Sequence, residues 1–139
     1  MKVSKYALMG LALSLAACGG ASKITAPSDI NDQRVFFGFD QYNITPEAKN
    51  NLLGQSMYMK EHKDTKIQIA GNADERGTVE YNLALGARRA NAAKKVLVDD
   101  GVEAKRIKTI SFGKERPWKK GTGESVWKYN RNAHTTTIK

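Results

Sequence analysis

The stretch that most constrains what this chain can fold into is GNADERGTVEYNLALGARRANAAKKVL, which runs from Gly71 to Leu97. It begins at the end of a segment of alternating polarity, crosses a polar loop, and continues with helical periodicity. At about 100° per residue, Arg89 lies in the middle of the more apolar face of this helix. The apolar side chains on that face are Tyr81, Leu85, Ala92, Ala93 and Val96. We therefore predict a strand, a loop and a long helix in immediate succession.

Arg89 is the charged residue that this helix has to accommodate. A guanidinium stays protonated in proteins, so an arginine directed at the apolar side needs an anion there. The nearest upstream carboxylates are Asp74 and Glu75, on the loop that leads into the helix. Two interpretations follow. Asp74 and Arg89 form a bipolar pair at the mouth of a pocket, or they form a structural salt bridge that pins the loop to the helix.

The flanking segments predict an α+β fold. The expected elements are a strand at 34–40, a helix at 46–63, a strand at 66–71, a helix between Thr78 and Gly101, and strands at 106–113 and 130–139. Residues 114–129 are expected to form a polar excursion between the last two strands. This order predicts a two-layer sandwich, with helices on one face of a mixed four-stranded sheet.

Short-range signals define the ends of these helices. Thr45 followed by Pro46 predicts an N-cap and a first helical residue. Gly77 is expected to adopt a backbone conformation that other residues resist, and Gly101 to provide a left-handed helix end.

The aromatic run of the first strand predicts core packing. Phe36, Phe37 and Phe39 are expected to be buried, with one exception among them. Asp40, which follows, either shapes the floor of the pocket or begins the turn into the next segment.

The first 17 residues have the features of a bacterial signal peptide. Lys2 and Lys5 introduce an apolar run that is too short to span a bilayer as a mature helix and ends in small residues. Their removal lowers the formal net charge from +9 to +7. Cys18 is the sole cysteine and has no partner for an internal disulfide, so its place after Leu-Ala-Ala predicts lipidation.

The mature chain is expected to contain one domain. Residues 18–33 are short, polar and interrupted by Pro27, which predicts a flexible tether after the lipidated cysteine. Its fourteen residues 19–32 reach at most about 50 Å when fully extended. The domain is expected over residues 34–139.

The motif G-x-A-D-E-R-G-T-x-E-Y-N-x-x-L-G-x-R-R-A-N-A closely resembles the signature of the OmpA-like peptidoglycan-binding domain family. Its DERGT-EYN variant looks most like the Pal branch of that family, and the similarity extends over roughly residues 34–133. Leu-Ala-Ala-Cys is likewise similar to the bacterial lipobox. In such lipoproteins Asp after the cysteine implies the inner membrane, so Gly19 implies an outer-membrane anchor with the domain facing the periplasm.

The resemblance implies noncovalent binding of peptidoglycan, which would tether the outer membrane to the cell wall. The ligand group is the side-chain end of meso-diaminopimelate, where one carbon carries an ammonium and a carboxylate. Asp74 matches the family residue that accepts from the ammonium, and Arg89 the residue that grips the carboxylate. Weaker candidates for this site are Phe39, Asp40, Asn72, Ala73, Asn82 and Arg131. The resemblance also implies a Tol-Pal system in envelope integrity and cell division, with TolB as a protein partner.

Two positions depart from the family pattern. Asn72 stands where Pal-like sequences usually carry His, and Asn132 replaces the second Arg of an N-R-R ending whose first Arg is Arg131. Glu75 and Arg76 are expected to be surface charges of the loop, and Asn82 to cap or hold it. These departures affect the expected specificity rather than the fold.

Other function classes find little support in the sequence. No nucleophile stands beside a base, and no phosphate-binding glycine loop is present, so we predict a binding protein rather than an enzyme. No cofactor is expected. His62 and His134 lie far apart without a cysteine or carboxylate cluster, which argues against a metal site. The basic charges are scattered, which argues against nucleic acid. A lipoprotein acting mainly as a periplasmic protein-interaction module is the alternative function.

Overall fold

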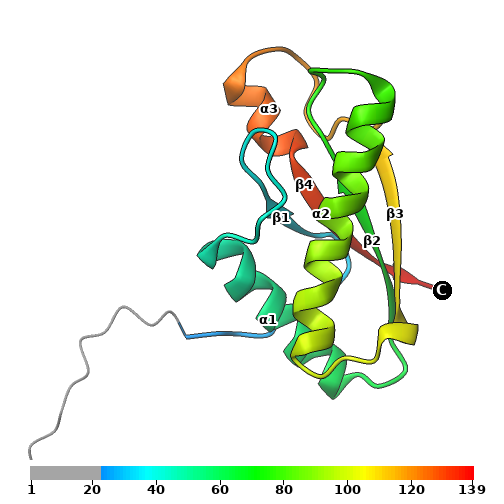
Figure 1. The fold of residues 1–139 in the computed structure, drawn as a ribbon. Coiled ribbons are helices and arrows are strands. Elements are labelled where there is room, and N and C mark those ends of the chain that lie inside the picture. The colour runs from blue at the N-terminus through cyan, green and yellow to red at the C-terminus, as the bar shows by residue number, and fades with distance from the viewer. Residues whose placement is uncertain (1–22) are drawn as a thin grey trace, which may run out of the picture.

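The computed structural model describes residues 23–139, and the predicted signal peptide and Cys18 lie outside the described residues. The chain forms two layers, a four-stranded sheet and the helices in front of it (Figure 1). The elements are β1 Gln33–Phe36, α1 Pro46–Glu61, β2 Lys66–Asn72, α2 Val79–Asp99, β3 Ile107–Gly113, α3 Glu124–Asn130 and β4 Asn132–Ile138. A single 3₁₀ turn, Ala104–Arg106, precedes β3.

The sheet has the strand order β1-β4-β2-β3 and is mixed. β2 and β3 run parallel, while β4 lies antiparallel to both β1 and β2. The parallel pair is joined by α2, whose length returns the chain to the other end of the sheet (Figure 1). This arrangement confirms the predicted α+β sandwich.

Local sequence signals start and end the helices as predicted. The Thr45 hydroxyl accepts from the backbone N–H of Ala48 at 3.1 Å at the start of α1. The Thr78 hydroxyl accepts from the backbone N–H of Tyr81 at 3.1 Å at the start of α2. Each bond satisfies a donor that the helix itself leaves unpaired. Gly77 and Gly101 have φ angles of 96° and 103°, in the region that favours glycine.

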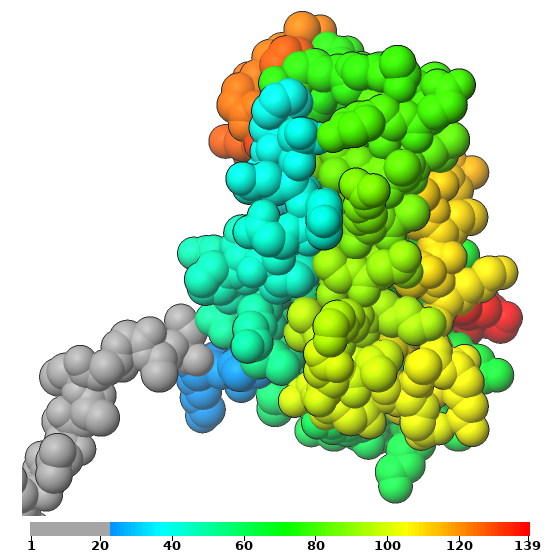
Figure 2. Space-filling view, viewed as in Figure 1, coloured from blue at the N-terminus to red at the C-terminus, as the bar shows by residue number. Residues whose placement is uncertain are grey.

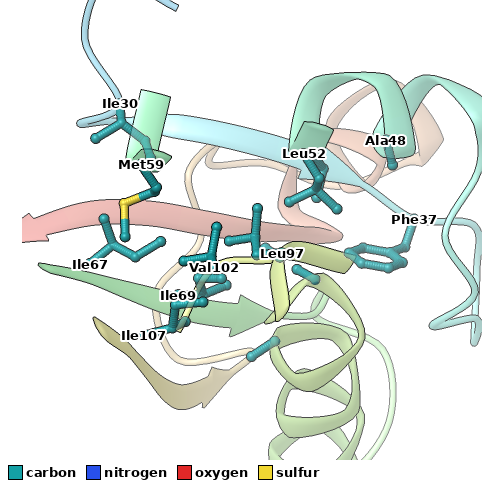
Figure 3. Packing of buried hydrophobic residues seen from close by; sticks show 14 residues of the cluster. Ile30, Phe37, Ala48, Leu52, Met59, Ile67, Ile69, Leu97, Val102 and Ile107 are labelled. Carbon is teal, nitrogen blue, oxygen red and sulfur yellow. The ribbon is translucent and has the colours of Figure 1, made fainter. Parts of the chain in front are cut away.

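The core lies between the sheet and the helices (Figure 3). Its largest apolar side chains are Ile30, Leu52, Met59, Ile67, Ile69 and Leu97. The buried stripe of α2 differs from the predicted face: Tyr81 is half exposed, whereas Ala90 and Leu97 are fully buried. The whole stripe is Asn82, Leu85, Gly86, Arg89, Ala90, Ala93 and Leu97.

Two glycines bring α2 unusually close to the sheet. A Cβ placed on Gly71 in β2 would lie 1.6 Å from the carbonyl oxygen of Gly86 in α2. Real side chains do not approach backbone so closely, so only glycine allows this contact. The contact positions α2, and with it Arg89, directly against the end of β2.

Three predictions about the elements are wrong. β1 ends at Phe36 rather than at residue 40, so Phe37 is buried but Phe36 and Phe39 are 39% and 57% exposed. The excursion at 114–129 contains the start of α3, which the sequence analysis missed. α3 is only seven residues long, which is too short for a clear helical period. It ends at Asn130, the first residue of the segment expected to be the last strand, and β4 begins at Asn132.

Within the described part of the chain, no helix is long and apolar enough to cross a membrane.

Candidate functional site

A pocket of about 210 Å³ opens where the loop after β2 meets the start of α2 and the turn after β1. Its lining residues are Phe39, Asp40, Ala73, Asp74, Arg76, Gly77, Tyr81, Asn82, Leu85 and Arg89. Figure 2 shows the turn after β1 lying alongside the first half of α2. The pocket is smaller than the roughly 300–1,000 Å³ typical of drug-sized ligands. It can therefore hold a small headgroup rather than a whole sugar ring with its substituents.

Arg89 is fully buried, and backbone oxygens rather than a carboxylate hold it. Its Nε donates to the carbonyl of Gln41 at 2.8 Å, and its two terminal nitrogens donate to Asn72 at 2.9 Å and Gly38 at 3.0 Å. The expectation that this arginine needs an anion is wrong, because three carbonyl dipoles take that place. Burial lowers the pKa of the guanidinium to about 10, which leaves it charged at neutral pH.

Asp74 lies in the same pocket and has a different partner. Its carboxylate accepts from Arg76 Nη2 at 2.8 Å and from Arg76 Nε at 3.1 Å, in a two-pronged contact. Arg131 Nη1 lies 3.5 Å from Asp74 Oδ2, the oxygen that Arg76 Nη2 also contacts. Burial raises the pKa of the Asp74 carboxyl, but the hydrogen bonds from Arg76 outweigh burial, so its pKa falls below the usual value. Asp74 is therefore an anion at neutral pH.

Asp74 and Arg89 line one pocket without pairing with each other. Among the salt bridges of residues 23–139, none joins them. The alternative of a structural salt bridge between the loop and the helix is therefore wrong. The pocket presents a negative group and a positive group that are separately held.

Arg76 is part of the pocket, which corrects its assignment as a surface charge. Besides contacting Asp74, its guanidinium stacks between two aromatic rings. The guanidinium carbon lies 3.8 Å from the ring centre of Phe39 and 4.1 Å from that of Trp127. Glu75, whose carboxylate accepts from the Trp127 indole N–H at 3.0 Å, stays at the surface. Aromatic faces favour a cation, so this guanidinium is held from three sides.

Asp40 and Ala73, two of the weaker candidates, both line the pocket. Asp40 has a φ angle of 55°, and its carboxylate accepts from the hydroxyl of Tyr81 on α2. Asp40 thus both turns the chain and borders the pocket. The Ala73 N–H donates to the carbonyl of Gly113 at 2.8 Å, which anchors the loop to the end of β3.

Asn82 holds the loop, as predicted. Its amide donates to the carbonyl of Arg76 at 2.8 Å and to that of Thr78 at 3.0 Å. Because Asn82 is buried on α2, these bonds fix the loop that carries Asp74 to the helix that carries Arg89.

Arg131 does not line the pocket but contacts Asp74, which does. It donates to the carbonyl of Phe37 at 2.9 Å and pairs with Glu124 at 2.6 Å, besides its contact with Asp74. Glu124 belongs to α3, the helix that was not predicted.

The two departures from the family pattern lie elsewhere. Asn72 and Asn132 are buried beside each other, and the Asn72 amide donates to the side-chain oxygen of Asn132 at 2.9 Å. Neither side chain lines the pocket of Asp74 and Arg89. Asn72 contributes to it only through the backbone carbonyl that Arg89 contacts.

Sequence reasoning missed Arg76, Tyr81 and Trp127 as parts of this site. Arg76 had a signal, since a cation two residues after Asp74 on one loop can reach back to it. Tyr81 and Trp127 had none, because their contacts with Asp40 and Glu75 span 41 and 52 residues. No group of three or more His, Cys, Asp or Glu residues that could hold a metal ion occurs in residues 23–139.

Comparison with known proteins gives the class to which this fold and pocket belong. Residues 36–131 match the OmpA family. A peptidoglycan-associated lipoprotein of Pasteurella multocida is 40% identical over 144 residues, covering 95% of this chain and 96% of the relative. One from Mesorhizobium japonicum is 50% identical over 103 residues, covering 74% of this chain and 61% of the relative. The chain thus spans less than two thirds of that longer relative.

Solved structures agree with the sequence relatives. The crystal structure of the peptidoglycan-associated lipoprotein from Burkholderia pseudomallei has a TM-score of 0.73 and 40% identity, covering 76% of this chain and 89% of that one. The C-terminal domain of Helicobacter pylori MotB has a TM-score of 0.69 at 17% identity, covering 77% and 84%, a likeness that concerns the fold alone. The chain therefore belongs to the OmpA family and, within it, to the peptidoglycan-associated lipoproteins.

Proposed function

We propose that the pocket binds the free amino-acid end of diaminopimelate in peptidoglycan stem peptides. The observation that carries this proposal is that Asp74 and Arg89 line one small pocket and are not paired with each other. An ammonium and a carboxylate on one carbon need an anion and a cation held apart in this way. The pocket volume also suits a headgroup of this size.

Arg89 acts in this proposal as a buried positive charge with unused donors. A guanidinium has five N–H donors, and three of them contact backbone carbonyls. The remaining two are free to receive a carboxylate when the turn at Gly38–Gln41 adjusts. Two of the three carbonyls belong to that turn, so Arg89 also shapes the rim on which Phe39 and Asp40 lie.

Arg76 occupies the position that the ligand ammonium would take beside Asp74. Its two-pronged contact satisfies the carboxylate in the absence of ligand. We infer that binding exchanges this guanidinium for the ammonium, or adds the ammonium at the remaining lone pairs. Such an exchange replaces one charge-assisted bond by another, which favours reversible binding over very tight binding.

At the level of the cell, we propose that the chain tethers the outer membrane to the cell wall through a lipidated Cys18. Support comes from the lipobox-like sequence and from relatives named peptidoglycan-associated lipoproteins. We also propose that the chain takes part in a Tol-Pal system with TolB as a partner, and this proposal is supported by the resemblance to the Pal branch of the family. Cys18→Ser should release the protein from the membrane fraction, and its persistence there would contradict this anchor.

The test is a pull-down of the protein with purified sacculi, competed by free meso-diaminopimelate. Cadaverine, which lacks both carboxylates, and pimelate, which lacks both ammonium groups, are the matched competitors. We expect diaminopimelate alone to displace the protein. Equal displacement by cadaverine would contradict the role of Arg89, and equal displacement by pimelate would contradict the role of Asp74.

Variants separate the two charges. Asp74→Asn removes one charge-assisted bond worth roughly 1.5–3 kcal/mol, so affinity should fall about 10- to 150-fold. Arg89→Lys keeps the charge but loses the geometry of the fork and should also weaken binding. Arg88→Ala, at the exposed neighbouring position, is the control and should bind as the wild type does. Circular dichroism of each variant checks that the fold is retained.

A further inference from the structure

The sheet face that carries neither α1 nor α2 presents a second set of functional side chains. Along β2, Ile67 and Ile69 are buried toward the helices, so Gln68, Ala70 and Asn72 point to the other side. The pairing register places Arg34 and His134 on that side beside Ala70, and Phe36 beside Asn132. This face is separate from the pocket of Asp74 and Arg89.

Three aromatic rings form an exposed cluster on this face, which we call the aromatic patch: Phe36, Trp118 and Tyr129. Phe36 and Trp118 stack with ring centres 6.1 Å apart, and Tyr129 meets both edge-on at 6.3 and 5.9 Å. Each ring remains 38–43% exposed. Large aromatic side chains so close together and so exposed are typical of binding surfaces.

Cations surround the aromatic patch. The guanidinium carbon of Arg34 lies 4.0 Å from the ring centre of Trp118, and Lys119 Nζ lies 4.9 Å from the same ring centre. Lys128 Nζ lies 5.2 Å from the ring centre of Tyr129. Arg116 stacks on Phe112 at 3.7 Å nearby.

Most of these cations lack an acidic partner. Arg34 is paired with Asp32, but Arg116, Lys119 and Lys128 form no salt bridge within residues 23–139. Glu115 is the acid nearest in sequence to Arg116 and Lys119, and Glu124, which pairs with Arg131, is the acid nearest to Lys128. The patch is therefore rimmed by an excess of positive charge.

A hollow of about 270 Å³ lies beside the patch. The residues that line it include Trp118, Arg34, Arg116, Asn72 and Asn132. Asn72 is 7% exposed, and its side-chain oxygen has no hydrogen-bond partner in the described structure. A buried acceptor without a partner is costly and rare. The lining of the hollow is thus polar, which suits a hydrogen-bonding side chain better than an acyl chain.

We propose that this face binds an acidic segment of a protein partner that also carries hydrophobic side chains. The unpaired cations attract its carboxylates, and the aromatic patch contacts its apolar residues. A lipid surface fits less well, because cations already cover ring faces and the hollow has polar groups in its lining. This surface does not depend on the peptidoglycan pocket, so both can be occupied together.

The test uses the full chain and a fluorescein-labelled twelve-residue peptide that alternates Glu with Leu and Phe. Binding is followed by fluorescence anisotropy. The variant Arg116→Glu/Lys119→Glu/Lys128→Glu reverses the cations around the patch. Its control, Lys49→Glu/Lys63→Glu/Lys139→Glu, makes the same change in net charge at exposed positions elsewhere. We expect the peptide affinity to fall at least tenfold in the first variant and less than threefold in the control.

Trp118→Ala, which keeps every charge, should also weaken peptide binding at least threefold. Each variant should still bind sacculi as the wild type does, and this shows that the domain is folded. Equal loss in both triple variants, or no binding of the peptide by the wild type at millimolar concentration, would overturn the proposal. The proposal would also be overturned if the peptide did not bind and the protein instead bound vesicles of phosphatidylcholine and phosphatidylglycerol in a way that required Arg116, Lys119 and Lys128.

Discussion

Gly71→Ala should both destabilise the domain and disable its pocket. The added Cβ would lie 1.6 Å from the carbonyl oxygen of Gly86, whereas ordinary contacts begin near 3.4 Å. α2 must therefore move away from β2 by about 1.8 Å, the difference between these distances. Forcing extra volume into such a contact costs roughly 1–3 kcal/mol, and a clash of a Cβ with backbone, which cannot rotate away, belongs at the upper end.

The same displacement reaches Arg89, one turn further along α2. Its three hydrogen bonds, now 2.8–3.0 Å long, cannot survive a shift of that size without rearrangement. A loss of 2–3 kcal/mol lowers the melting temperature by about 8–12 °C, taking roughly 4 °C per kcal/mol for a domain of this size. Binding to sacculi should weaken in parallel.

The assay is thermal unfolding followed by circular dichroism, together with the competed pull-down. Gly38→Ala is the matched control, because its Cβ would meet only the side chain of Gln41, which can rotate away. Its melting temperature should stay within about 2 °C of the wild type. If Gly71→Ala unfolds at the wild-type temperature, the close contact of α2 with β2 does not position Arg89 and the reasoning fails.

Three further predictions concern the rest of the domain. Arg106→Met removes donors to the carbonyls of Met59, His62 and Thr65 at the end of α1 and should cost roughly 1–3 kcal/mol by urea unfolding, whereas Lys105→Met at the exposed neighbouring position should not. Burial lowers the pKa of His134 below its usual 6.5, so just below that pH the unfolded chain binds more protons than the folded one. The free energy of unfolding should therefore fall as pH decreases through this window. Between pH 7.5 and 5.5 the His134→Gln variant should lose less stability than the wild type, and equal losses would contradict this cause. Asn132→Arg should lower the melting temperature, because Asn132 is 1% exposed and donates to the carbonyl of Tyr129. The concentration of diaminopimelate needed to displace this variant from sacculi should equal that for the wild type. A lower concentration would show that this position reaches the pocket.

Features that depend on neighbours within one or two turns could be predicted from the sequence. Thr45 and Thr78 cap their helices through bonds that span three residues. Gly77 and Gly101 adopt the positive φ angles that their positions at helix ends require. The motif around Asp74 also placed the loop correctly against α2.

The partners of the charged residues could not be predicted, because they lie far away along the chain. Arg89 contacts carbonyls 48 and 51 residues upstream, so the need for a counter-charge was met by backbone that no sequence pattern marks. Asn72 and Asn132, 60 residues apart, proved to contact each other on a different face from the pocket. Only the register of β2 and β4 decides that pairing.

The sequence by itself determined the order of the four strands and the two long helices, the ends of those helices and the pair of residues to test, since these follow from local propensity, periodicity and motif. The tertiary structure decided which charges neutralise each other. In the folded chain Arg89 donates to backbone carbonyls and Asp74 accepts from Arg76. The two charges of the pocket are therefore not paired with each other. Electrostatic partners depend on distance in space, and the close contact of Gly71 with Gly86 sets that distance here.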